Sequence, residues 1–156
     1  MTSVRIRPAR PDEAPALSAL AMRSKAHWGY SAGFMESCRA SLTIEPAHCD
    51  GLSLLVAERD GQLAGFARVV GSPADGELSD LWVDPDAMGH GVGRTLFTAI
   101  TQQARQLGFR RLRIDSDPNA EAFYIHMGAV RIGETPSTAI QGRVLPLLSY
   151  EIPNPD

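Results

Sequence analysis

A glycine-rich turn constrains this chain more than any other feature of its sequence. The segment MGHGVGR, residues 88–94, has glycine at every second position from 89 to 93. It follows a strand-like run that stops at Asp84-Pro85, and a stripe of apolar residues at helical spacing begins at Val92. Unpartnered backbone N–H groups and the positive end of the helix dipole meet at such a helix start, so phosphate is the natural ligand there. The alternative is that the glycines only shape a tight turn.

Two familiar phosphate-binding loops do not fit this turn. A P-loop needs Gly-Lys-Ser/Thr, whereas the single lysine of the chain, Lys25, lies far away. A dinucleotide fingerprint needs a third glycine where this chain has Arg94 or Leu96, and it follows the first strand of a parallel unit rather than a hairpin. Asp115 lies about where a ribose-binding acid would be, which we treat as a coincidence. An enzyme that binds NAD or ATP is therefore a minor alternative.

Apolar periodicity and turn signals predict the elements around the glycine turn. We expect helices at 12–24, 31–42, 91–107 and 119–127, and strands at 4–7, 52–59, 63–70, 77–83, 111–115, 129–134 and 147–152. Asp60-Gly61 is expected to close a tight hairpin between the second and third strands. One right-handed parallel crossover then joins an antiparallel meander. The prediction is one domain, 1–156, with an α+β fold in three layers, α/β/α, around a mixed, mostly antiparallel sheet.

Composition and charge exclude several classes of function. A chain of 156 residues, 44% of them hydrophobic, can bury a core as one domain. It has no apolar run of membrane-spanning length and no secretory signal, so we expect a cytoplasmic protein with no membrane partner. The cysteines and histidines are scattered, which predicts no metal site. A net charge of -3 argues against a nucleic-acid partner. The window 87–114 nevertheless holds five arginines and no acid, as a local anion site or a solvated helix face would.

Two motifs together resemble the GNAT superfamily of acyl-CoA N-acyltransferases. LWVDPDAMGHGVGRTLF is similar to the family's strand, V-x-P, Q/RxxGxG/A and helix, and DPNAEAFYIHMGA is similar to its second motif, which ends in Phe-Tyr and a glycine. The resemblance covers about residues 63–150. Met88 departs from the usual Arg or Gln, and Ala129 from the usual aromatic. The resemblance implies a GNAT-like fold and an N-acetyltransferase that uses acetyl-CoA to acetylate a primary amine of a small molecule or peptide.

The resemblance also implies which residues bind acetyl-CoA. The amides of the glycine turn would hold the pyrophosphate, with further contacts from Arg94 and Thr95. The end of the preceding strand would pair with the pantetheine arm and donate an N–H to the developing oxyanion. The implied cofactor-binding residues are Leu81, Trp82, Val83, Gly89, His90, Gly91, Val92, Gly93, Arg94, Thr95, Asn119, Ala122 and Tyr124.

Tyr124 and Glu77 are the implied catalytic residues. Tyr124, at the Phe-Tyr position, would protonate the leaving thiolate, and its alternative role is to anchor a helix on the sheet. The acceptor ammonium must lose a proton before it attacks, and Glu77 matches the position of a base in some family members. Asp80 and Asp115 are neighbouring acids. Regular strand alternation puts Glu77 and Asp80 on opposite faces, so they are not both expected to face the substrate, and each acid can equally be a surface residue.

The resemblance implies an acceptor site between the loop that joins the first two helices and the C-terminal strands. Its implied residues are His27, Trp28, Tyr30 and Phe34 on one wall and Arg143, within 140–146, on the other. The aromatic residues can instead belong to the core, and Arg143 can bind a substrate carboxylate or a surface acid. A silent acyl-CoA sensor would keep the same cofactor motifs, and it would differ in releasing no CoA with amines. A homodimer is an option by family habit only.

Overall fold

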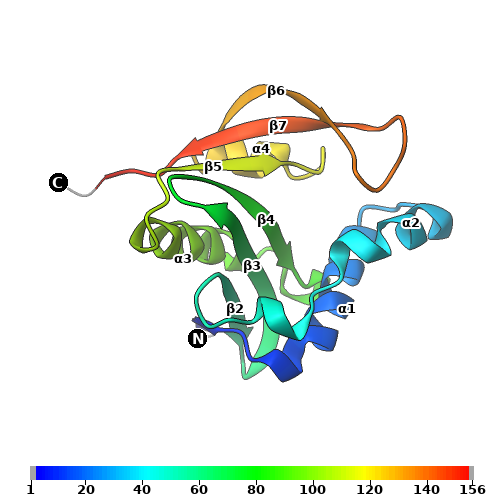
Figure 1. Ribbon diagram of the computed structural model, residues 1–156. Coiled ribbons are helices and arrows are strands. Elements are labelled where there is room, and N and C mark those ends of the chain that lie inside the picture. The colour runs from blue at the N-terminus through cyan, green and yellow to red at the C-terminus, as the bar shows by residue number, and fades with distance from the viewer. Residues whose placement is uncertain (1–2, 155–156) are drawn as a thin grey trace.

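A computed structural model describes residues 3–154 of this chain as a seven-stranded sheet flanked by helices (Figure 1). The helices are α1 (Ala14–Ala26), α2 (Ala32–Leu42), α3 (Val92–Gln106) and α4 (Glu121–His126). The strands are β1 (Val4–Pro8), β2 (Leu54–Arg59), β3 (Gln62–Ser72), β4 (Asp75–Val83), β5 (Arg111–Asp115), β6 (Val130–Pro136) and β7 (Val144–Glu151). Their order across the sheet is β1-β2-β3-β4-β5-β7-β6, and only the β4–β5 pair is parallel.

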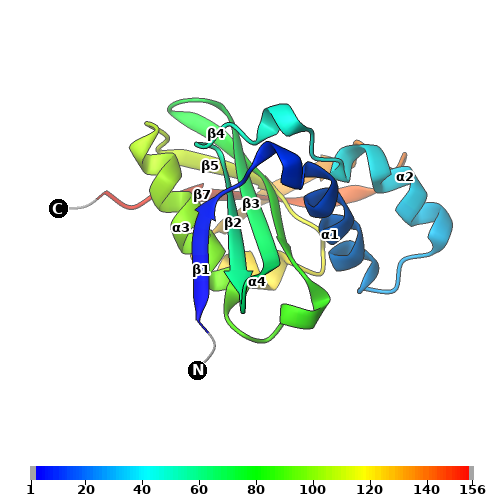
Figure 2. The ribbon, with the colours of Figure 1, turned by 90° about the horizontal axis from the view of Figure 1, so that it is seen from below.

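The sheet has a hydrophobic core on each face, which confirms the predicted α+β fold in three layers. Phe97 of α3 and Tyr124 of α4 belong to one buried cluster with residues of the sheet. Leu17 and Leu20 of α1 belong to a second cluster, which holds Phe66 from β3. Figure 2 shows α1 and α2 well apart from α3. None of the helices in the described part of the chain has the length and apolar character needed to cross a membrane.

Local sequence signals predicted most elements within a few residues. The hairpin turn at Asp60 and Gly61 is present, and both residues have positive φ, 55° and 75°. Helix α4 begins at Glu121, two residues after the predicted start at 119. The reason is that Asp117 starts a separate turn, in which the amide of Ala120 donates to the carbonyl of Asp117 at 2.9 Å.

The sheet opens into a fork between its two central strands. β4 pairs with β5 only through Asp75–Glu77 and Arg111–Arg113. Beyond Glu77 the two strands diverge, and Figure 1 shows β3 and β4 running away from β5 and β7. The second half of β4 therefore has β3 on one edge and an open edge on the other.

A β-bulge at Ser79 changes which side chains of β4 face the fork. Val69 pairs with Leu78 and Arg68 pairs with Asp80, so Ser79 is an extra residue in β4. The extra residue reverses the alternation: Leu78 and Leu81 pack on the α3 side, whereas Trp82 packs on the α1 side. Glu77 and Asp80 therefore line the same cavity. The prediction that these two acids lie on opposite faces of the strand was wrong, because it assumed unbroken alternation.

Candidate active site

Two cavities meet in the fork. The glycine-turn pocket, about 420 Å³, is lined by the end of β4, residues 87–94 of the turn apart from His90, and the start of α4. The fork pocket, about 250 Å³, is lined mainly by β4, by 114–120 and by the loop between β6 and β7. The lining shared by both pockets is Leu81, Trp82, Asp117, Ala120 and Tyr124. Groups held in the two pockets would meet at these residues.

The glycine turn has the shape of an anion cradle. Gly89 and Gly91 have φ of +82° and +78°, a left-handed conformation that favours glycine, and Gly91 caps α3. A Cβ added at either residue would meet no atom within 4 Å, so the space beside the turn is open. The first amides of α3 have no partner within the helix. The turn therefore fits a pyrophosphate through backbone N–H groups.

The open edge of β4 presents backbone donors to the same pocket. The amide of Asp84 donates to the carbonyl of Ala64 at 2.8 Å, which shows which residues of β4 have N–H groups that face β3. Because antiparallel pairs alternate, Trp82 also bonds toward β3, whereas the N–H groups of Leu81 and Val83 point to the open edge. This geometry separates the three predicted residues: within the part of the chain that the structure describes, Leu81 and Val83 have N–H groups that face no neighbouring strand, and Trp82 contributes its side chain.

Three of the predicted cofactor residues lie outside the pocket lining. His90 has its Nδ1 atom 3.3 Å from Nη2 of Arg59 and does not line the pocket. The hydroxyl of Thr95 donates to the carbonyl of Gly91 at 3.0 Å and so closes the first turn of α3. Ala122 is exposed on α4. The remaining predicted cofactor residues, Leu81, Trp82, Val83, Gly89, Gly91, Val92, Gly93, Arg94, Asn119 and Tyr124, all line the pocket.

Tyr124 lies where the two pockets meet. Its side chain is buried, with the ring 5.4 Å from that of Phe123 and 6.3 Å from that of Phe97. Its hydroxyl makes no hydrogen bond within residues 3–154. Burial, together with the nearby carboxylates of Asp80 and Asp117, raises the pKa of Tyr124 well above its ordinary value. The hydroxyl therefore keeps its proton at neutral pH.

The acids of the fork pocket differ in their partners. Burial, followed by the charges of Asp115 and Asp80, raises the pKa of Glu77, whose carboxylate has no hydrogen bond or ion pair in the described part of the chain. Burial also raises the pKa of Asp80, which accepts from the indole of Trp82 at 3.1 Å. Asp115 pairs with Arg113 at 2.7 Å. Glu77 is thus the acid with free acceptor oxygens. Within residues 3–154, no three His, Cys, Asp or Glu side chains are grouped so that they could hold a metal ion.

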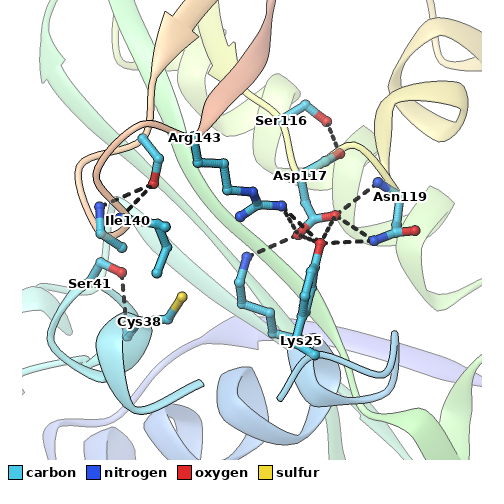
Figure 3. Close-up of polar contacts among 11 residues, drawn as sticks. Lys25, Cys38, Ser41, Ser116, Asp117, Asn119, Ile140 and Arg143 are labelled. Carbon is cyan, nitrogen blue, oxygen red and sulfur yellow. Dashed lines mark hydrogen bonds and ion pairs between the residues drawn. The ribbon is translucent and has the colours of Figure 1, made fainter. Parts of the chain in front are cut away.

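Asp117 is the centre of a polar cluster between the pockets (Figure 3). Its carboxylate accepts from Lys25 Nζ at 2.9 Å, from the Tyr30 hydroxyl at 2.9 Å and from the amide of Asn119 at 2.8 Å. Arg143 Nη2 lies 3.7 Å from it. Burial opposes its ionisation, but these hydrogen bonds outweigh burial and lower the pKa of Asp117. The cluster ties α1, the turn before α4 and the β6–β7 loop together.

The predicted acceptor residues are divided between several positions. Arg143 lines the fork pocket, and Tyr30 and Phe34, stacked at 4.2 Å, lie behind its guanidinium. Trp28 is half exposed and lines the glycine-turn pocket instead. His27 packs edge-on against Trp28 and lines neither pocket.

Lys25 and Asp117 are the site residues that sequence reasoning missed. Lys25 is the single lysine and ends up buried, and the Asp117-Pro118-Asn119 run carries only the signal of a turn. The two side chains meet across 92 positions of sequence. The one sequence signal that could have pointed to Lys25 is that the chain has no other lysine.

Comparison with known proteins agrees with this geometry. The model of the acetyltransferase (GNAT) family matches residues 20–129. This chain belongs to the GNAT acetyltransferase family. A mycothiol acetyltransferase from Streptomyces griseus is 37% identical over 91 residues, which cover 57% of this GNAT chain and 29% of that protein. The GNAT chain thus spans less than a third of that curated relative.

Solved structures share the GNAT fold over nearly the whole chain. A GCN5-related N-acetyltransferase from Rhodopseudomonas palustris superposes with a TM-score of 0.77 at 25% identity, over 96% of each chain. PaiA N-acetyltransferase from Thermoplasma acidophilum, solved in complex with coenzyme A, has a TM-score of 0.74 at 18% identity, over 96% of this chain and 99% of that one. The forked sheet described above is therefore the GNAT fold, as the sequence resemblance implied.

Proposed function

We propose that this GNAT chain transfers an acetyl group from acetyl-CoA to a primary amine, which attacks the thioester directly. The observation that carries the proposal is the meeting of the two pockets. One pocket has an anion cradle and an open strand edge, and the other has a carboxylate that has no partner among residues 3–154. Tyr124, whose hydroxyl keeps its proton, lies where they join.

The chain binds acetyl-CoA through backbone groups. The amides at the start of α3 hold the pyrophosphate, and the open edge of β4 pairs with the amides of the pantetheine arm as another strand would. Met88 lines this pocket with a thioether where the family usually has Arg or Gln. The loss of that side chain leaves the backbone donors in place. When bound, acetyl-CoA supplies the thioester that an amine can attack.

The N–H groups at the end of β4 act on the oxyanion that forms when the amine attacks, and the hydroxyl of Tyr124 acts on the thiolate that is released when the C–S bond then breaks. A fixed N–H from Leu81 or Val83 meets the negative charge that develops on the carbonyl oxygen, and such donors contribute about 3 to 4 kcal/mol in comparable sites. Tyr124 gives its proton to the departing sulfur. Its hydroxyl is protonated over the whole neutral range, so the proton is available at the junction of the two pockets when the sulfur leaves.

Glu77 removes the proton that the acceptor amine must lose. Its carboxylate is the fork-pocket acid without a partner in the described residues, and its raised pKa brings it closer to neutral pH, where a general base works best. Glu77 lies about four residues before Leu81 on β4, roughly 13 Å in an extended strand, so the proton travels through water. Asp80 already binds Trp82 and holds that ring between the pockets.

The test is CoA release in the presence of acetyl-CoA and a panel of primary amines, with the acetylated amine identified by mass spectrometry. We expect release that depends on the amine and falls in Glu77→Gln. Binding of acetyl-CoA without release by any amine would contradict the proposal and favour an acyl-CoA sensor.

A further inference from the structure

The two ends of the fork pocket carry opposite charges. Glu77 lies where β4 and β5 are still paired, Asp115 follows two residues after Arg113, the partner of Glu77, and Asp80 follows along β4. Trp82, five residues beyond Glu77, marks the other end, and five residues of strand span roughly 15 Å. Lys25 Nζ lies 5.7 Å from the centre of the Trp82 ring, within the cluster around Asp117. The pocket thus runs from an acidic end to a basic end.

The basic end carries one more positive charge than it can neutralise. Two cations, Lys25 and Arg143, share the single carboxylate of Asp117, and the side chains are only 10%, 19% and 9% exposed, respectively. Lys25 binds that carboxylate directly at 2.9 Å, whereas Arg143 Nη2 is 3.7 Å away. A partly buried cation without a full partner favours an anion. Arg143 is therefore the cation that remains available to bind a further anion.

Arg143 is held in position but keeps free donors. Its guanidinium carbon lies 4.9 Å from the ring centre of Phe34 and 5.3 Å from that of Tyr30, so it packs against both rings. Nη2 donates to the Tyr30 hydroxyl at 2.9 Å. The Nε and Nη1 groups donate no hydrogen bond to any residue from 3 to 154. A guanidinium that is held in place and has free N–H groups is suited to bind a carboxylate.

We propose that the acceptor is an amino acid-like zwitterion, whose carboxylate binds Arg143 while its amino group lies beside Tyr124, on the side of Asp80 and Glu77. This inference rests on the proposed acetyl transfer and specifies its substrate class. The volume of about 250 Å³ lies below the range of pockets for drug-sized ligands, so the pocket suits a small free molecule. The terminal amine of a peptide has an amide group where a free amino acid has its α-carboxylate, so it does not offer that anion to Arg143.

The test compares common amino acids with their primary amides and with the amines that lack the carboxyl group. CoA release is measured for the parent and for Arg143→Met, Arg143→Lys and Arg105→Met, the last being an exposed arginine on α3 far from the fork pocket. A second measurement follows the thermal shift that the same compounds give in the CoA-saturated protein. Acetyl-CoA affinity of each variant serves as the check on folding.

We expect at least one amino acid to exceed its amide in kcat/KM by about 10- to 100-fold, the range for hydrogen bonds to charged groups. Arg143→Met loses this preference, Arg143→Lys keeps part of it, and Arg105→Met keeps all of it. Equal use of amides, or a preference that survives in Arg143→Met, overturns the inference but leaves acetyl transfer intact. If no compound releases CoA, acetyl transfer fails. The thermal shift then decides: stabilisation that needs both the carboxylate and Arg143 supports the inference, and its absence refutes it.

Discussion

Replacing Tyr124 with phenylalanine removes one hydroxyl from the junction of the two pockets. The ring contacts with Phe97 and Phe123 remain, and no hydrogen-bond partner within residues 3–154 is left unsatisfied. Stability should therefore change by less than about 1 kcal/mol. General acid catalysis contributes about 10²- to 10⁴-fold, so kcat should fall by at least about 100-fold, equivalent to about 2.7 kcal/mol. The affinity for acetyl-CoA should stay within a few-fold.

The assay is CoA release under saturating acetyl-CoA and amine, with binding measured separately by titration. Tyr150→Phe is the matched control, because Tyr150 also packs against Phe97, at 4.9 Å, but lines a different cavity. It should keep the parent kcat. Equal turnover by Tyr124→Phe and the parent would refute the assignment of Tyr124 as the acid, and leave it as an anchor between helix and sheet.

Three further changes test other parts of the account. Gly91→Phe should abolish acetyl-CoA binding in a thermal-shift assay, whereas Gly51→Phe, strained by a similar φ of +83° in a turn that lines neither pocket, should retain it. Glu77→Gln should lower kcat/KM about 10- to 100-fold and remove the decline that the parent shows as pH falls through the raised pKa of Glu77; an unchanged pH profile would exclude Glu77 as the base. The two hydrogen bonds from Arg7 lower the pKa of Glu13 to about 2, below its unfolded value near 4.3, so their stabilisation is present above roughly pH 4 and lost as pH falls toward 2. Urea unfolding of Glu13→Gln should show a loss of about 2 kcal/mol at pH 7 that vanishes near pH 2, and a loss independent of pH would contradict the pairing.

The features that sequence predicted correctly are those with local causes. The hairpin at Asp60-Gly61 depends on two adjacent residues that tolerate positive φ, and α3 depends on an apolar stripe within one segment. The parallel crossover follows from the order strand, turn, helix, strand. Each of these is decided by neighbours in the chain. The cytoplasmic location and the homodimer remain predictions.

The features that sequence missed depend on contacts between distant segments. The bulge at Ser79 arises in the pairing of β4 with β3, and it alone brings Glu77 and Asp80 to one cavity. β7 lies between β5 and β6, an order that chain succession does not dictate. Lys25 and Asp117 meet across 92 positions, so no local pattern predicts their pairing. The cofactor side of the site was accessible to sequence reasoning because its donors belong to one contiguous segment, the end of β4 and the glycine turn, whereas the acceptor side is assembled from five separate segments.

The most direct test of the central claim is the thermal shift of the purified protein with acetyl-CoA, CoA, NAD and ATP measured in parallel. A ligand present at about 100 times its dissociation constant stabilises the folded state by roughly 2.7 kcal/mol. The account predicts a rise in Tm with acetyl-CoA and CoA that NAD and ATP do not match. No response to the CoA compounds, or an equal response to NAD or ATP, would contradict it.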